Sequence, residues 1–354
     1  MLKKEEVVLK EESLGLFPNW ESIFNRKAPI FLEIGIGNGE FIKWIAERHP
    51  ENNYVGVEVA REFFKKAVNR ITSSGLTNVR LIHCEGAKAL CQLFKNGSLS
   101  GLYLNFPDPW AKKKQKRRRL VNKLFPWLLA LKLLDSGFFL MVTDFKEYAE
   151  EVVEAFLNTK CFAPLWKEGP MRNRLEDYYH TKYARKWLAC GLPLFFVGFK
   201  KVKTPENIPA EVFEYYPILK ISKEDSMPHS IIQVEKPFVP SELVNELPEG
   251  IIFQKDQKVI KILEKFLSSK SVLLDSLISE GHLVQRFFVT ISPHSNGLIV
   301  KIHDSDKPLP TEGVHTLIAL LTKELLRIYS GKLLKTTCKK HIIKTFTTEE
   351  VNST

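Results

Sequence analysis

The sequence predicts an α/β domain built on a doubly wound parallel sheet, followed by a smaller α+β domain. Three observations lead to this prediction. Short runs rich in β-branched and aromatic residues alternate with helical patterns between residues 29 and 203. A glycine-rich segment directly follows the first run. The alternation stops after a stretch punctuated by prolines, and 354 residues are enough for two hydrophobic cores.

Six segments of the first domain are predicted to be strands, because each is short and dominated by β-branched or aromatic residues. They are Ile30–Ile34, Tyr54–Val59, Val79–Cys84, Leu102–Phe106, Phe138–Val142 and Leu194–Phe199. Between them apolar residues recur every three or four positions, as at Ala67, Val68 and Ile71, which predicts amphipathic helices. Strands that alternate with helices predict a parallel sheet with helices on both faces.

A small α+β domain is predicted after a proline-rich linker that starts at Thr204. Its predicted elements are a helix over residues 255–269, a hairpin made of Gln285–Ile291 and Leu298–His303, and an amphipathic helix over Val314–Tyr329. The predicted limits are an N-terminal arm over residues 1–28, the α/β domain over 29–203 and an extension of unknown role over 204–354.

The positive charge is concentrated in the first domain. The chain has 52 Lys+Arg against 41 Asp+Glu, and residues 1–203 hold 34 of the cations but only 22 of the carboxylates. Within that domain Lys112–Arg119 places seven cations in eight residues. Such a run repels itself and stays solvated unless phosphates neutralise it. It is therefore either a solvated surface loop or a contact to nucleic acid, which the release of counterions strengthens.

Several classes of protein are excluded by the sequence. No apolar stretch reaches the roughly 20 residues of a membrane-spanning helix. The charged residues that follow Met1 do not form the apolar core of a secretory signal. The five cysteines are odd in number and contain no C-x-x-C pair. We expect reduced thiols in a cytoplasmic protein, with neither a disulfide framework nor a metal site.

A cofactor loop is predicted directly after the first strand. The segment Leu32–Glu40 reads L-E-I-G-I-G-N-G-E and contains Gly35, Gly37 and Gly39. Glycine is needed where the backbone turns sharply and approaches a ligand closely. A dinucleotide site favours the spacing G-x-G-x-x-G, whereas the third glycine of this sequence comes one residue early.

Two carboxylates frame the predicted loop. Glu58 ends the second strand, where a carboxylate can accept both hydroxyls of a ribose. Glu33 ends the first strand and can hold an ammonium group through a charge-assisted hydrogen bond. S-adenosylmethionine has both a ribose and an amino-acid head, whereas a nicotinamide cofactor lacks that head. The alternative is that both carboxylates are satisfied by backbone amides or solvent.

An acceptor site is predicted at the exit of the fourth strand, Asn105–Trp110, which reads N-F-P-D-P-W. Two prolines flank Asp108 and restrict the backbone around its carboxylate, while Trp110 offers a flat surface on which a base can stack. Asp144 follows the next strand and adds a second carboxylate to the same edge. The basic run begins two residues after Trp110, so a base platform and a phosphate clamp are neighbours. A proline-rich strand exit with a buried aromatic residue is the plainer alternative.

The chain resembles the bacterial tRNA (guanine-N7)-methyltransferase family in five motifs. They are L-E-I-G-I-G-N-G-E, V-G-V-E-V, N-F-P-D-P-W-A-K-K-K-Q-K-R-R-R-L, T-D-F and H-T-K-Y-A-R. The proline-flanked aspartate with its basic run is the most specific of them. The resemblance covers residues 29–203, and the extension from residue 205 onward lies outside the usual family pattern.

The resemblance implies a class I, Rossmann-like methyltransferase that transfers a methyl group from S-adenosylmethionine to N7 of a guanine in the variable loop of tRNA, at position 46. It implies Asp108 as the catalytic residue. The predicted cofactor contacts are then Glu33, Gly35, Gly37, Gly39, Glu58, Glu85, Asn105 and Asp108. The predicted substrate contacts are Lys112, Asp144 and Thr181, and the tRNA backbone is predicted to lie on Lys113, Lys116, Arg117 and Arg118. No obligate protein partner is predicted.

One position departs from the family pattern. The family's T-x-[FY]-E reads Thr181–Ala184 in this chain, so the glutamate is missing and Arg185 has no acceptor oxygens to replace it. Two other functions stay open. One is a methyltransferase for an exocyclic base amine, because N-F-P-D is similar to the motif of such enzymes; the other is an RNA-binding module with a vestigial cofactor site. A dinucleotide-dependent oxidoreductase fits the glycine spacing poorly.

Overall fold

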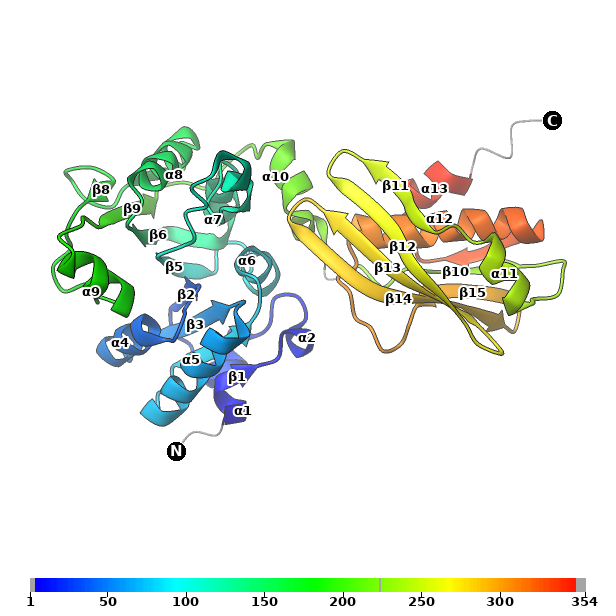
Figure 1. Cartoon of the computed structure of the whole chain (residues 1–354), viewed down its shortest axis with the longest axis horizontal. Coiled ribbons are helices and arrows are strands. Elements are labelled where there is room, and N and C mark those ends of the chain that lie inside the picture. Colours follow the sequence, from blue (N-terminus) through cyan, green and yellow to red (C-terminus); the bar gives the residue numbers. More distant parts are fainter. Residues whose placement is uncertain (1–3, 223, 348–354) are drawn as a thin grey trace. The chain divides into compact units, whose positions relative to one another are not determined.

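The computed structural model describes residues 4–222 and 224–347 and divides the chain into two compact units, Met1–Val212 and Phe213–Thr354 (Figure 1). The division falls inside α10 (Ala210–Tyr215), so it comes later than the predicted boundary at residue 203. Residues 1–3 of the predicted arm, and 223 and 348–354 of the predicted extension, lie outside the described residues. Among the described residues no helix is both long and apolar enough to cross a membrane.

The first unit contains one sheet, whose strand order is β1-β4-β3-β2-β5-β6-β9-β7, with β8 paired to β9. All neighbouring pairs among β1 to β6 are parallel, and β9 runs antiparallel to its three partners. The strands are β1 (Val8–Leu9), β2 (Ile30–Ile34), β3 (Asn53–Glu58), β4 (Val79–His83), β5 (Leu99–Asn105), β6 (Leu133–Thr143), β7 (Phe162–Pro164), β8 (Met171–Arg172) and β9 (Phe195–Lys201). The six predicted strands are confirmed.

Helices cover both faces of this sheet, as predicted. On one face α4 (Glu40–Arg48) and α5 (Arg61–Ser74) share a buried cluster with Tyr54 and Tyr103. Alternate side chains of the strands point to the other face, where α6 (Gly86–Leu93), α7 (Phe125–Lys132) and α8 (Lys146–Asn158) pack. On that face Phe139 of β6 contacts both Phe125 and Phe156.

The N-terminal residues belong to the first unit. They form α1 (Lys4–Val7), β1, α2 (Glu11–Leu14) and α3 (Trp20–Phe24), and β1 extends the sheet beside β4. The Trp20 indole donates a hydrogen bond to the Leu93 carbonyl at 3.1 Å and stacks on Phe94. Residues 4–28 therefore pack as part of the α/β unit and do not form a separate arm.

The strand order reverses between β2 and β5. The chain runs from β2 outward to β3 and β4, returns to β5 on the other side of β2, and continues to β6. In an open α/β sheet the helices leave in opposite directions at such a point, and ligands bind in the resulting crevice at the carboxyl ends of the strands. The ends of β2, β3, β4, β5 and β6 and the loops that follow them lie at this edge, and they contain the predicted site residues other than Thr181.

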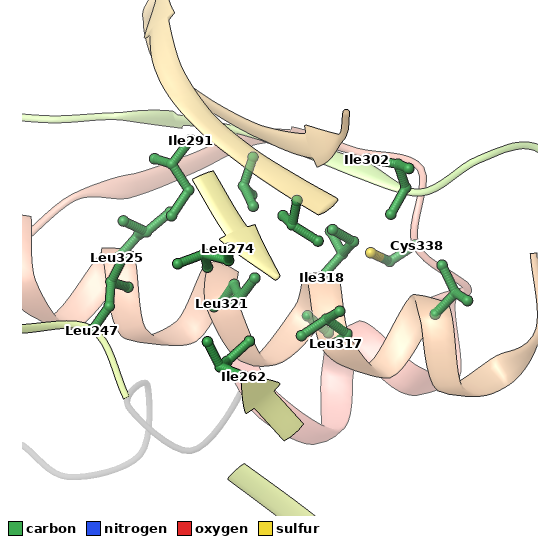
Figure 2. Packing of buried hydrophobic residues seen from close by; sticks show 14 of the residues in the cluster. Leu247, Ile262, Leu274, Ile291, Ile302, Leu317, Ile318, Leu321, Leu325 and Cys338 are labelled. Carbon is green, nitrogen blue, oxygen red and sulfur yellow. The ribbon is translucent and has the colours of Figure 1, made fainter. Parts of the chain in front are cut away.

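The second unit is an antiparallel sheet covered by a long helix. The sheet order is β11-β12-β13-β14-β15-β10-β16. Apolar side chains of the sheet pack on α12 around Leu274, Leu317 and Leu321 (Figure 2). The elements of this unit are η2 (Pro217–Lys220), β10 (His229–Gln233), α11 (Pro240–Glu246), β11 (Gly250–Lys255), β12 (Lys258–Leu267), β13 (Val272–Glu280), β14 (Leu283–His294), β15 (Gly297–Ile302), α12 (Glu312–Tyr329), β16 (Lys332–Thr336) and α13 (Lys340–Thr347).

The hairpin and the amphipathic helix predicted in the extension are confirmed as β14–β15 and α12, but the helix predicted over residues 255–269 is wrong. That segment is mostly strand β12. A β-bulge between Ile262 and Glu264 shifts the pairing register by one residue. The bulge breaks the period-two alternation of apolar residues and leaves a spacing that is typical of a helix. Pairing along both edges of β12 decides in favour of the strand.

Candidate active site

The cofactor loop connects β2 to α4 and contains three glycines in the left-handed region. Their φ angles are +73° at Gly35, +53° at Gly37 and +76° at Gly39. A Cβ at Gly35 or Gly37 would have no heavy atom within 4 Å, whereas one at Gly39 would lie 3.0 Å from the Ala67 Cβ of α5. The first two glycines thus leave open space beside the loop, and the third lets the loop pack on a helix.

The carboxylate of Glu58 braces this loop from the end of β3. One oxygen accepts the Gly37 amide at 2.9 Å and the other accepts the Ala60 amide at 2.8 Å. The side chain is largely buried. Backbone amides therefore hold Glu58, as the alternative interpretation expected. A carboxylate has about four lone-pair sites, so each oxygen keeps capacity for a ribose hydroxyl.

Glu33 is a buried carboxyl group with an unused oxygen. Its residue is 3% exposed, and its Oε1 accepts a hydrogen bond from the Asn105 Nδ2 at 3.0 Å. Its Oε2 is buried and lacks a hydrogen-bond partner of normal geometry among the described residues. Burial raises the pKa of Glu33 to about 8, and the hydrogen bond from Asn105 only partly offsets this. An incoming cation would satisfy the oxygen and favour the ionised form.

Asn105 links the cofactor end to a segment far along the chain. Its Oδ1 accepts a hydrogen bond from the Tyr178 hydroxyl at 2.7 Å while its Nδ2 donates to Glu33. Burial raises the pKa of Tyr178 well above its ordinary value, so this hydroxyl stays a donor. Tyr178 also packs against Phe41 of α4. Tyr178 could not be predicted from the sequence, because a tyrosine within a polar loop has no local signal.

Glu85 caps α6. Its two carboxylate oxygens accept the amides of Ala87 at 2.9 Å and Lys88 at 2.7 Å. Because β4 lies beside β3 in the sheet, this cap stands at the same edge as Glu58. A cap of this kind stabilises the helix by about 1 kcal/mol, so Glu85 has a structural role whether or not it also contacts a cofactor.

The acceptor loop follows β5 in a constrained backbone conformation. Two non-glycine residues have positive φ, +52° at Phe106 and +40° at Trp110. The Phe106 amide donates to the Val142 carbonyl of β6 at 2.8 Å, which ties the start of the loop to the next strand. Asp108 between them is exposed and makes no hydrogen bond or ion pair with another described residue. The loop holds a free carboxylate at the edge of the sheet.

The basic run divides into exposed and paired cations. It forms a short 3₁₀ helix, η1 (Lys113–Arg118). The side chains of Lys112, Lys113, Lys114, Arg117 and Arg118 are exposed. Lys116 pairs with Glu151 of α8 at 2.5 Å. The Arg118 guanidinium lies 5.1 Å from the centre of the Trp110 ring and occupies one face of the proposed stacking surface.

Arg119 is buried, although it belongs to a run that was expected to stay solvated. Its Nε donates to the Pro109 carbonyl at 2.7 Å, its Nη1 pairs with Glu151, and its guanidinium lies 4.5 Å from the centre of the Tyr148 ring. This arginine therefore holds the acceptor loop against α8. That role could not be predicted, because nothing in a run of seven cations distinguishes the buried one.

The remaining predicted substrate residues lie at the same end of the sheet. Asp144 is half-buried between β6 and α8. Thr181 caps α9 (Lys182–Ala189), and its hydroxyl accepts the Ala184 amide at 3.3 Å. Helix α9 packs toward β5 and β6 through a small apolar cluster, in which Ala184 lies with Val142 and Phe106. The fold thus gathers the predicted residues of six separate segments at one edge.

Comparisons with known proteins bear on this site. Residues 27–197 match the model of a family described as "Putative methyltransferase". A tRNA (guanine-N(7)-)-methyltransferase of Thermotoga maritima is 30% identical over 323 residues, which cover 90% of this chain and 97% of that protein. The enzyme of the same name from Coprothermobacter proteolyticus is 31% identical and covers 90% of this chain and 93% of its own length.

The chain belongs to the tRNA (guanine-N7-)-methyltransferase family. The prediction of a class I methyltransferase that uses S-adenosylmethionine is thereby confirmed. A relative from Geobacter metallireducens, 32% identical, matches only 54% of this chain but 92% of its own length. The alignment of 323 residues must reach beyond residue 300, so the second unit is shared with some members of the family and is not an addition peculiar to this chain.

The residues at the cofactor end fit S-adenosylmethionine. The unused Oε2 of Glu33 suits an ammonium group, and the open space at Gly35 and Gly37 allows a ligand to approach the loop. The spare acceptor capacity of Glu58 suits a ribose. Together these residues would offer acceptors for an amino-acid head and for a sugar on one surface, and a dinucleotide without such a head would not need the first of them.

Proposed function

We propose that the protein transfers the methyl group of S-adenosylmethionine to N7 of a guanine in the variable loop of tRNA. One observation carries the proposal. The buried carboxyl group of Glu33, with its unused oxygen, lies near the end of β2, and the exposed carboxylate of Asp108 follows the neighbouring strand β5. The strand order reverses between these two strands. A cofactor site and an acceptor site are therefore adjacent.

The chemistry needs no general base. Guanine N7 has a lone pair in the ring plane and no proton to lose, so its attack on a methyl group depends on alignment. S-adenosylmethionine, when bound, supplies that methyl group on a positively charged sulfur. Methyl transfer moves positive charge into the purine. Asp108 and Asp144 are proposed to stabilise that charge, and Asp108 to accept hydrogen bonds from the base edge and orient N7.

The exposed cations are proposed to hold the tRNA backbone. Lys112 and Lys113 lead into η1, and Arg117 and Arg118 close it, with all four side chains in solvent. They directly follow the loop that contains Asp108. Phosphates on this segment would place a nucleotide beside the proposed catalytic carboxylate. Thr181 at the start of α9 is proposed as a further substrate contact.

We also propose a cytoplasmic location and action without an obligate protein partner. The five cysteines are free, and four of them are buried, which suits a reducing compartment. A reaction with purified protein alone tests the second statement. The tRNA is the proposed macromolecular partner.

The deciding experiment identifies the product. The purified protein is incubated with S-adenosylmethionine labelled in the methyl group and with unmodified tRNA, and the RNA is digested to nucleosides. Labelled N7-methylguanosine is expected, and a transcript in which the variable-loop guanine is replaced by adenosine should stay unlabelled. A product methylated on an exocyclic amine would assign Asp108 to a different acceptor. Absence of label, with tRNA still bound, would favour an RNA-binding module.

A further inference from the structure

We propose that Glu40 is a positioning residue that fixes helix α9, and with it Thr181, against the cofactor loop. The inference rests on the proposed function, because it concerns the alignment of the same two sites. Glu40 is the first residue of α4 and directly follows Gly39. Helix α9 begins more than 140 residues later, at Lys182. The Glu40 side chain joins these two segments.

The contacts of Glu40 reach both sides of the junction. Its Oε2 accepts the Lys182 backbone amide at 3.0 Å and lies 3.6 Å from the Arg185 Nη2. Its Oε1 accepts the Asn38 Nδ2 at 3.1 Å and lies 3.7 Å from the Arg70 Nη2. Its side chain is only 11% exposed. One oxygen therefore holds α9, while the other holds the loop and α5.

A carboxylate at the start of α9 has a clear physical purpose. The first amides of a helix have no intrahelical acceptor, and the helix dipole favours a negative charge beside them. With Thr181 as the cap, a glutamate at position 184 would complete a capping box by reaching back to the Thr181 amide. Ala184 has no such group and is 2% exposed among apolar side chains. Glu40 brings the missing charge to this helix end from another element.

Capping from another element also determines where the helix lies. A glutamate at position 184 would be part of α9 and would stabilise the helix in any position. Glu40 belongs to α4, so its hydrogen bond to Lys182 breaks if α9 moves away from the glycine loop. Neighbouring contacts agree, because Tyr179 packs on Trp44 of α4 and Tyr178 donates to Asn105. A reaction that depends on alignment is sensitive to displacements of about 1 Å, which can reduce the rate by about 100-fold.

The first test compares kcat with the two binding constants. Glu40→Ala should lower kcat for tRNA methylation about 10-fold, with the Kd values of S-adenosylmethionine and tRNA each changed less than about 3-fold. Glu40→Gln keeps an acceptor for the Lys182 amide, so its kcat should be only about 3-fold lower than that of the wild type. Glu47→Ala is the matched control, since Glu47 is an exposed residue of the same helix whose one ion pair among the described residues is with the half-buried Lys43. The control should keep full activity.

A double-mutant cycle tests whether Glu40 acts through α9. If it does, the effect of Glu40→Ala on kcat should shrink to less than about 3-fold when Thr181 is already alanine, because the residue being positioned has been removed. If the reduction of kcat in the double variant equalled the product of the reductions in the two single variants, the proposal would be overturned. Unchanged kcat in Glu40→Ala would also overturn it. Loss of S-adenosylmethionine binding in that variant would assign Glu40 to local support of the loop instead.

These results are distinguishable from failure of the proposed function. If the wild-type protein forms no N7-methylguanosine in tRNA, the proposed function fails. If it forms that product and Glu40→Ala does so equally well, only the positioning role of Glu40 fails. Thermal unfolding of all variants completes the set, and a change of melting temperature of less than about 3 °C is expected for Glu40→Gln.

Discussion

The two ends of the site lie on neighbouring strands of one sheet, yet they hold their polar groups differently. At the cofactor end Glu33 and Glu58 are buried, and Glu58 uses both oxygens to brace the glycine loop. At the acceptor end Asp108 and most of the cations of the basic run are exposed. The buried exception is Arg119, which binds the backbone of the acceptor loop and holds no free charge for a ligand.

The two ends therefore differ in what their charged groups cost the folded protein before a ligand binds. A buried carboxyl group is costly to ionise until a ligand compensates its charge. We therefore expect ligand binding at the cofactor end to be coupled to proton release and to stability. An exposed carboxylate or cation costs the folded state little. We therefore expect charge changes at the acceptor end to alter ligand binding with little effect on stability. Substitutions at the two ends should therefore differ in their side effects as well as in their size.

The largest expected effect tests the acceptor end. Asp108→Asn keeps the shape of the side chain but removes its charge, and it should lower kcat about 100- to 1000-fold, the usual result of removing one electrostatic contact to a transition state. Because Asp108 is exposed and has no hydrogen bond or ion pair with another described residue, the melting temperature should not change. The measurement is single-turnover methylation of tRNA alongside calorimetric titration with S-adenosylmethionine. If cofactor affinity fell and kcat at saturation did not, Asp108 would belong to the cofactor end.

The next effect tests the cofactor end. Gly35→Val fills the open space beside the loop and forces a β-branched residue into φ +73°. Affinity for S-adenosylmethionine should fall about 100-fold. Binding of tRNA in the absence of cofactor should stay within about 2-fold, which a filter-binding assay measures. Equal losses of both affinities would show that the two ends form one cooperative surface and do not bind their ligands separately.

A smaller effect follows from the pKa of Glu33. The free protein holds a proton on Glu33 below about pH 8, and an ammonium ligand displaces it. Affinity for S-adenosylmethionine should then rise up to about 10-fold per pH unit between pH 6 and 7.5, and level off near pH 8, where an α-amino group also loses its proton. Titration calorimetry in buffers of different ionisation enthalpy should detect the released proton. Glu33→Gln should bind weakly at every pH, with no such rise.

The same pKa gives a stability effect of opposite sign. The folded pKa of about 8 is above the ordinary value of 4.5, so the folded protein binds more protons than the unfolded chain between these values. Stability without cofactor should therefore fall as pH rises through this window. Glu33→Gln has no proton to lose, so above about pH 6 its melting temperature should exceed that of the wild type. An unchanged melting temperature at pH 7.5 would mean that burial does not perturb Glu33.

The place of the predicted cofactor residues at one edge of the sheet could be predicted from the sequence, because these residues stand at or just after strand ends. Gly35, Glu33 and Glu58 each occupy a position that a parallel sheet brings to one edge, whatever the rest of the chain does. Glu40 and Tyr178 could not be predicted in this way. Their partners lie more than 70 residues away in the sequence, and only the tertiary fold of residues 178–185 against α4 and β5 brings them together.

The second unit shows the limit of local patterns for the fold. The helix over 312–329 was predictable, because its apolar stripe is long and uninterrupted. Strand β12 was not, because one bulge changed the phase of its apolar residues and made the spacing helical. Pairing with β11 and β13 outweighs such a pattern. The residues of β12 alone do not show which strands will pair with it.

The smallest expected effect distinguishes two lysines within the basic run. Lys113 is exposed and has no ion pair within the part of the chain that the structure describes, whereas Lys116 pairs with Glu151 at 2.5 Å. Lys113→Gln should weaken tRNA binding about 2- to 5-fold near physiological salt. It should also reduce the slope of log Kd against log salt concentration by about 0.7 to 0.9, the value of one lost phosphate contact. Lys116→Gln should reduce the slope by less than half as much, since its charge is already partly neutralised by Glu151. Equal slopes for the two variants would mean that tRNA draws Lys116 away from Glu151, and the run would then act as one flexible clamp.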